Sequence, residues 1–268
     1  MNTPMRKGWL KKGCRKLRMG IIPLLFLPFF SFANGMDRAD SLFALANTYY
    51  QKNAFGQAIE IYHQIIETGI QTPEVLYNLG NAYYKDKNLG HAILYYEKAK
   101  LLAPNDDDIN LNLAIANAHI VDKIDIIPDF FIKRWIVRLV NLLPSNTWAI
   151  LSLVSFTLML ALFLLYFFSG NRLLKRIGFY SAVSLLLLAI LTFWCSFRRA
   201  DAISGSAAAI VMEPSVAIKS SPDAEGNNVF MLHEGTRVMV IDSIENWMNI
   251  KLTDGNKGWV ERNAIEPV

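Results

Sequence analysis

The residue types that carry most enzyme chemistry are few in this sequence and stand far apart. Cys14 lies in a basic N-terminal segment and Cys195 in a long apolar run, so we expect neither a disulfide nor a thiol nucleophile in the remaining domains. Four histidines are present: His63, His91, His119 and His233. They show no spacing typical of metal ligands and no paired nucleophile. The sequence therefore predicts no catalytic residue, no cofactor and no metal site, and we expect the protein not to be an enzyme.

One acidic run, Asp106-Asp107-Asp108, has the charge to attract calcium. It lacks the alternating ligand spacing and the glycine of an EF-hand loop, so calcium is the less favoured alternative. The run follows Pro104, and negative charge is favourable at the N-terminus of a helix. We expect it to form the N-cap and first turn of a new helix.

A repeated pattern of large and small residues precedes that acidic run. Shifting the segment LYNLGNAYYKDKNLGHAILYYEKAKLLAP (76–104) back by 34 residues aligns Leu76 with Leu42, Leu79 with Leu45, Gly80 with Ala46, Tyr83 with Tyr49, Ala92 with Ala58 and Tyr96 with Tyr62. A 34-residue period of this kind resembles the tetratricopeptide repeat, which is a pair of packed helices. Small residues let the two helices approach, and the tyrosines fill the space beside them. A third copy starts in register but does not continue, so we expect two repeats and a capping helix in residues 36–127.

The resemblance to tetratricopeptide repeats also implies a peptide-binding site on the concave face of the first helices. The positions it selects are Phe43, Asn47, Tyr50, Tyr77, Asn81, Tyr84 and Lys85. An amide at Asn47 or Asn81 can donate to and accept from a peptide backbone, and the aromatics can hold an apolar side chain. The carboxylate-binding variant of the family has lysine where Phe43 and Tyr77 stand, so capture of a C-terminal carboxylate is not expected. In the alternative, these residues cover the next helix.

The N-terminal 35 residues have the pattern of a secretory signal peptide. All seven of their basic residues precede the apolar run IIPLLFLPFF, and no acid accompanies them. An uncleaved anchor is the alternative. Removing this segment takes the net charge from +4 to about −3, so the basic balance reflects targeting and does not indicate a nucleic-acid partner.

Two later runs without charge, residues 148–168 and 177–197, are each about long enough to cross a bilayer. The loop between them, 169–176, is short, so we expect a hairpin with both flanking regions on one side. The export signal places that side in the periplasm and the loop in the cytoplasm, although basic residues outside the hairpin count against this orientation. A buried core hairpin is the alternative.

Residues 128–147, with Phe131 and Trp135 on one face, predict an amphipathic helix at the membrane surface or a last helix on the repeats.

After a linker at 198–205, residues 206–268 give short β-rich stretches separated by turn signals, which predicts a small all-β barrel or sandwich. The order of Ser221-Pro222, Glu234-Gly235-Thr236, Trp247, Asp254-Gly255 and Gly258-Trp259-Val260 resembles the bacterial SH3 domain. We expect Gly258 to supply backbone freedom in a turn. Trp247 and Trp259 predict either a ligand groove or large core residues, and Trp247 is the stronger ligand candidate.

The modules, taken in order, resemble the BatE family of the Bacteroides aerotolerance operon. That resemblance implies a membrane protein encoded beside von Willebrand A-domain proteins and a MoxR-type ATPase, with a link to oxidative-stress tolerance or envelope maintenance. It therefore predicts a scaffold in the bacterial inner membrane whose periplasmic modules gather membrane or periplasmic proteins, including von Willebrand A-domain proteins. In the alternative, the SH3-like domain binds peptidoglycan peptides and the repeats report to a partner.

Overall fold

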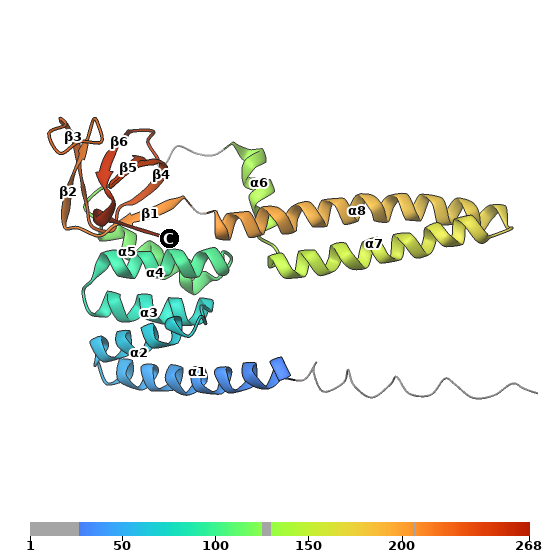
Figure 1. Ribbon diagram of the computed structural model, residues 1–268, viewed down its shortest axis with the longest axis horizontal. Coiled ribbons are helices and arrows are strands. Elements are labelled where there is room, and N and C mark those ends of the chain that lie inside the picture. Colours follow the sequence, from blue (N-terminus) through green and yellow to red (C-terminus); the bar gives the residue numbers. More distant parts are fainter. Residues whose placement is uncertain (1–26, 125–129, 206) are drawn as a thin grey trace, which may run out of the picture.

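A stack of helices and a β-sheet lie together at one end of a long two-helix hairpin in the computed structural model (Figure 1). The structure describes residues 27–124, 130–205 and 207–268, with side chains from Arg38 onward. The predicted signal peptide therefore falls largely outside the described residues. Its last part belongs to the first helix, whose backbone is continuous from Leu27.

The predicted repeats form two helix-turn-helix pairs and a fifth helix. The helices are α1 (Leu27–Gln51), α2 (Phe55–Glu67), α3 (Pro73–Lys85), α4 (Leu89–Leu102) and α5 (Asp107–Ala118). The Thr72 hydroxyl accepts from the amide of Val75 to cap α3, and Pro73 occupies its first position. Asp106 caps α5 by accepting from two backbone amides, as the acidic run predicted.

Close packing within each pair explains the repeated small and large residues. A Cβ at Gly80 would lie 2.7 Å from the ring of Tyr96 and 3.3 Å from the carbonyl oxygen of Ala92, so only glycine allows this approach. Tyr62 and Tyr96, which are equivalent in the two repeats, are both buried. Most of the aligned positions are therefore buried contacts within the pairs, whereas Leu45 is exposed.

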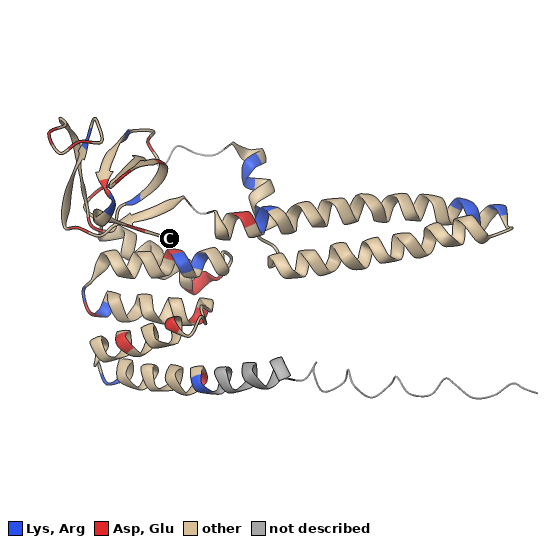
Figure 2. Cartoon of the chain, in the orientation of Figure 1, with Lys and Arg blue, Asp and Glu red and all other residues tan. Residues whose placement is uncertain are grey.

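The hairpin consists of α7 (Ser145–Phe168) and α8 (Arg172–Ser204), which pack along their length. Both helices are long and apolar enough to cross a membrane, and most of their large apolar side chains are exposed. Basic residues lie at the tip and at the opposite end, with none between (Figure 2). Helix α8 includes most of the predicted linker at 198–205, and Arg199 in this part donates a hydrogen bond to the end of α4.

A short helix, α6 (Phe131–Val140), lies across the base of the hairpin (Figure 1). Its main contacts are with α8, and Val140 is buried beside Trp148. Most of its apolar side chains, including Phe131 and Trp135, are exposed. The apolar stripe predicted from the sequence thus has no helix of the repeats packed over it within the described residues.

The C-terminal region forms one antiparallel sheet of seven strands. They are β1 (Ala208–Val211), β2 (Ser215–Lys219), β3 (Asn228–His233), β4 (Arg237–Ile244), β5 (Trp247–Lys251), β6 (Lys257–Glu261) and β7 (Ile265–Pro267). The order is β3-β2-β6-β5-β4-β1-β7, so β3 and β7 are edge strands that do not pair with each other. The predicted closed barrel is therefore wrong. The sheet is open, and its β1 side packs on α4, with Ile210 and Val268 joining the core of the repeats.

Gly258 has a different role from the one expected. It lies in β6, and a Cβ there would meet the side chain of Ile218 and come within 2.9 Å of the carbonyl oxygen of Lys219 on β2. The glycines of this region with positive φ are Gly235 (85°) and Gly255 (97°). Gly258 is therefore required by close strand packing, whereas backbone freedom is required at the two turns.

The sheet and the repeats share one hydrophobic core and several polar contacts. Glu234 accepts a 2.7 Å hydrogen bond from the amide of Gly90, in the first turn of α4. Ion pairs join Arg237 to Glu97 and Lys98 to Glu266 across the same interface. Two repeats are few for independent stability, and the sheet adds buried contacts that support them.

Candidate functional site

The residues predicted to bind a peptide lie on the first helices of the two repeats. Phe43, Asn47 and Tyr50 are half-buried on α1, and Tyr77, Asn81 and Tyr84 are half-buried on α3, while Lys85 is exposed. Phe43 makes an edge contact with Tyr62, and Tyr50 with Phe55, so the aromatics of α1 lean on their own repeat.

A hydrogen bond that occurs once in each repeat fixes both asparagine amides. The hydroxyl of Tyr62 donates to Oδ1 of Asn47 at 2.6 Å, and the hydroxyl of Tyr96 donates to Oδ1 of Asn81 at 2.7 Å. Burial, with a smaller effect of nearby Tyr50, raises the pKa of Tyr62 to about 12, so the hydroxyl stays protonated and remains a donor. The Oδ1 atoms are thereby held toward the second helix of each pair.

The free capacity of these amides is mainly to donate. Oδ1 of Asn81 also accepts from Nδ2 of Asn112 on α5 at 2.8 Å, which uses both of its lone pairs. Within the described part of the chain, no group accepts from Nδ2 of Asn47 or Asn81. The amides were expected both to donate to and to accept from a peptide backbone. The geometry restricts Asn81 to donating and leaves Asn47 one lone pair.

Helix α5 borders the same face. Nδ2 of Asn112 donates to the hydroxyl of Tyr77 at 2.8 Å, and Tyr84 makes an edge contact with His119. The second repeat thus partly contacts the capping helix, as the alternative interpretation required, while α1 lies farther along the stack. Asn112 was not identified from the sequence because it is out of register with Asn81.

The register itself points to one further residue. Ile115 stands 34 residues after Asn81, and it lies between Asn112 and His119, which both face α3. Its side chain is 41% exposed. Equivalent positions in the three units therefore hold two amides and one apolar side chain.

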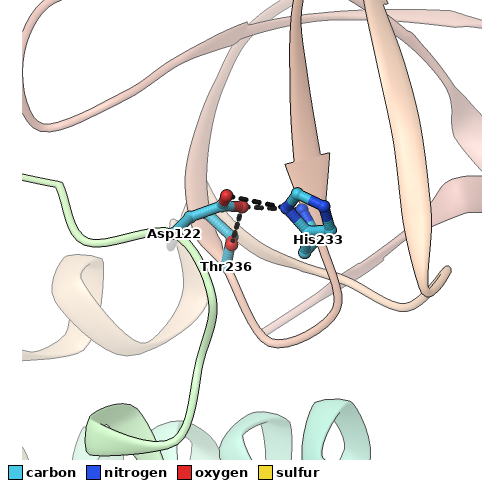
Figure 3. A network of polar contacts seen from close by, with 3 residues as sticks. All are labelled: Asp122, His233 and Thr236. Carbon is cyan, nitrogen blue, oxygen red and sulfur yellow. Dashed lines mark hydrogen bonds and ion pairs between the residues drawn. The ribbon is translucent and has the colours of Figure 1, made fainter.

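A second polar cluster joins the segment after α5 to the sheet (Figure 3). One oxygen of Asp122 accepts from the backbone amide of His233 at 2.6 Å and from the hydroxyl of Thr236 at 2.7 Å. The other oxygen lies 2.8 Å from Nδ1 of His233. Burial tends to raise the pKa of Asp122, but the hydrogen bonds from His233 and Thr236 outweigh it and lower the pKa overall.

This cluster has the residue types of a hydrolase site without its geometry. Thr236 donates to Asp122 and has no contact with the imidazole, so no base is placed to activate the hydroxyl. An ionised carboxylate only accepts, so Nδ1 of His233 carries the proton in this bond. The cluster therefore joins the segment after α5, called the connector below, to the sheet. The sequence gave no signal for it, because Asp122 and His233 are 111 residues apart and His233 looks isolated.

The outer face of the sheet carries both tryptophans of the predicted ligand groove. Strand pairing sets Asn249 opposite Trp259, with Trp247 two residues away on the same face, while Ile250 and Val260 point into the core. Both tryptophans are half-buried, and the alternative that they fill the core is not observed. Oδ1 of Asn249 is buried without a hydrogen-bond partner.

Comparison with known families identifies the repeats. Residues 41–74 and residues 73–106 each match the tetratricopeptide repeat family. The first segment contains the C-terminal part of α1 and all of α2, and the second contains α3 and α4. Comparison with curated proteins gives no match. The chain therefore carries two tetratricopeptide repeats, which are modules for protein–protein interaction, and the comparison leaves the hairpin and the sheet unassigned.

Proposed function

We propose that this protein is a membrane-anchored interaction scaffold whose repeats bind an extended segment of a partner protein. The observation that carries the proposal is the repeated Tyr–Asn hydrogen bond, which presents the donor side of Asn47 and Asn81 in both repeats. Two donors at equivalent positions suit the carbonyl oxygens of one extended backbone. Ile115, in the third unit, suits an apolar side chain of the same segment.

The hairpin supplies the anchor in this proposal. We place α7 and α8 across the bacterial inner membrane, with the repeats and the sheet in the periplasm and the tip in the cytoplasm. Arg172, Lys175 and Arg176 at the tip agree with the excess of basic residues usual in cytoplasmic loops. Helix α6 would lie in the interface, because its apolar face is exposed and it crosses the base of the hairpin.

The resemblance to the BatE family suggests the biological setting. On that basis the partners would be other membrane or periplasmic proteins, including von Willebrand A-domain proteins. The assembly would be an envelope complex linked to oxidative-stress tolerance. The C-terminal sheet would then be an SH3-like module that is open on the side covered by α4.

Changing both asparagines to aspartate tests the amide donors. Asn47→Asp and Asn81→Asp keep an oxygen for each tyrosine hydroxyl but replace each free donor by an acceptor that repels a carbonyl. Gln57→Glu and Gln64→Glu make the same change of charge on the exposed face of α2 and serve as a matched control. Both proteins would be cross-linked in membranes, purified and compared by quantitative mass spectrometry.

We expect the double asparagine variant to lose its cross-linked partners while the glutamine variant keeps them. Circular dichroism checks that the helices persist in both proteins. Equal partner recovery from the two variants would refute the proposal that Asn47 and Asn81 bind the partner.

The second candidate function is binding of peptidoglycan peptides by the sheet. It is favoured by Oδ1 of Asn249, which lies unpaired between Trp247 and Trp259. Incubation with purified sacculi distinguishes the two functions. Binding that is lost in Trp247→Ala would support this candidate, whereas recovery with membrane proteins alone supports the scaffold.

A further inference from the structure

A cleft of about 330 Å³ lies where the repeats meet the base of the hairpin. Its walls come from the end of α4, the start of α5, the turn between α6 and α7, and one residue of α8. The lining is largely neutral except for Arg199 and Asp106, which carry opposite charges. The cleft is separate from the concave face of the repeats and from the outer face of the sheet.

Arg199 is buried to an extent that is unusual for an arginine. Only 4% of it is exposed, and its Nη2 atom donates to the carbonyl oxygens of Leu101 and Leu102 at 2.6 and 3.1 Å. In the part of the chain that the structure describes, no carboxylate forms an ion pair with it, and Nε and Nη1 have no acceptor. A buried guanidinium without a counter-ion is unfavourable, so an anionic group in the cleft would stabilise it.

The position of the cleft suggests where that anion comes from. Pro144, in its wall, directly precedes α7, and Arg199 follows Phe197, the last residue of the uncharged run in α8, by two positions. Both spans therefore leave the hydrocarbon region at this level, where phospholipid headgroups lie. This step rests on the membrane anchoring proposed above.

The second charge narrows the choice of headgroup. Oδ1 of Asp106 accepts from the amides of Asp108 and Ile109, whereas its other carboxylate oxygen has no partner among the described residues. A simple anion in the cleft would be attracted by Arg199 but repelled by this carboxylate. A primary ammonium can donate several hydrogen bonds to a carboxylate, but a quaternary ammonium can donate none.

We propose that this cleft binds the headgroup of a phosphoethanolamine lipid. The phosphate accepts from Nε and Nη1 of Arg199, and the ammonium donates to Asp106. Planar, bidentate recognition of phosphate is the geometry that a guanidinium favours. The bound lipid would join α8, α4 and α5 at the membrane surface.

The full chain, purified in mild detergent, would be mixed with dioleoyl phosphatidylethanolamine, phosphatidylcholine or phosphatidylglycerol at equal concentrations. Native mass spectrometry then measures the fraction of protein with bound lipid. We expect about tenfold stronger retention of phosphatidylethanolamine than of either other lipid, which corresponds to one additional charged hydrogen bond.

Two variants separate the two contacts. Arg199→Gln keeps an NH₂ group for the carbonyl oxygens of α4 but lacks the charge, so retention should fall about tenfold. Asp106→Asn keeps the N-cap oxygen. It should therefore only reduce the retention of phosphatidylethanolamine to that of phosphatidylcholine. Arg198→Gln and Asp107→Asn make the same charge changes at exposed neighbours outside the cleft and should have no effect.

Equal retention of the three lipids by the unmodified protein would overturn the proposal, as would equal retention by the Arg199→Gln and Arg198→Gln variants. Preference for phosphatidylglycerol would overturn it too, because Asp106 would then make no contribution. Carbonate extraction of membranes provides the check on anchoring. A chain released by carbonate contradicts the proposed function, whereas a retained chain without lipid preference contradicts this inference alone.

Discussion

Removing the carboxylate of Asp122 should open the contact between the repeats and the sheet. Asp122 receives three hydrogen bonds, two from His233 and one from Thr236. Asp122→Ala leaves the donors unpaired in a half-buried site. The connector after α5 should then separate from the turn between β3 and β4.

The magnitude follows from the number and type of bonds. A hydrogen bond to a charged group contributes about 1.5–3 kcal/mol, but three bonds to one carboxylate are not independent. We therefore expect a loss of about 3 kcal/mol in the free energy of local opening. At about 1.4 kcal/mol per factor of ten, amide exchange at His233 should become about 100-fold faster.

Hydrogen exchange followed by mass spectrometry, on the full chain in detergent, measures this opening directly. Peptides that cover His233 should exchange faster in Asp122→Ala than in the unmodified protein. The increase should be smaller in Asp122→Asn, which keeps one acceptor, and absent in Lys123→Ala. Peptides from the core of α3 and α4 serve as the control for global unfolding. Unchanged exchange at His233 in Asp122→Ala would refute the reasoning.

The same contact has a defined dependence on pH. The pKa of Asp122 is lower in the folded protein than the ordinary value of about 4, because the hydrogen bonds favour the ionised form. Its contribution to stability is therefore fully present above the unfolded pKa and is lost as the pH falls through the folded pKa. Exchange at His233 should respond to this carboxylate only below about pH 4, and the response should be absent in Asp122→Asn.

Three further outcomes are expected. Gly258→Ala should destabilise the protein by about 1–3 kcal/mol, because its Cβ would press on Lys219; a thermal melt with an unchanged midpoint would contradict this. Ile210→Ala should cost about 2–5 kcal/mol and lower the melting temperature of the helices together with that of the sheet, because its side chain is in the shared core. Reporter fusions should be cytoplasmic at Gly170 and periplasmic at Val268, and a cytoplasmic report from Val268 would disprove the proposed orientation.

Local features of the structure could be predicted because they depend on neighbouring residues. The 34-residue period identified the repeats, and the acidic run from Asp106 identified the start of α5. Long runs without charge identified the hairpin. In each case the determining interactions are a helical turn, a cap or an apolar face, which are visible within a short window of sequence.

Contacts between distant segments could not be predicted in the same way. Ile210 and Val268 pack on the core of the repeats, and nothing in the strand pattern distinguishes that surface from the inside of a barrel. The tilt of each asparagine amide depends on a tyrosine 15 residues away, on the partner helix. In the sequence, Arg198 and Arg199 are two basic residues at the end of a span and cannot be told apart. In the structure, Arg199 is buried and Arg198 is exposed.

These distant contacts converge on α4. Glu234 of the sheet accepts from an amide in its first turn, and Arg199 of the hairpin donates to carbonyl oxygens at its last turn. Each charge has the sign that the dipole of the helix favours at that end. The sheet and the hairpin both attach to this second helix of a repeat, whereas Asn47 and Asn81 lie on the first helices, where α5 covers part of the second repeat. The sheet and the hairpin are therefore joined to the repeats through α4, while the proposed peptide-binding amides of Asn47 and Asn81 belong to the other helix of each pair.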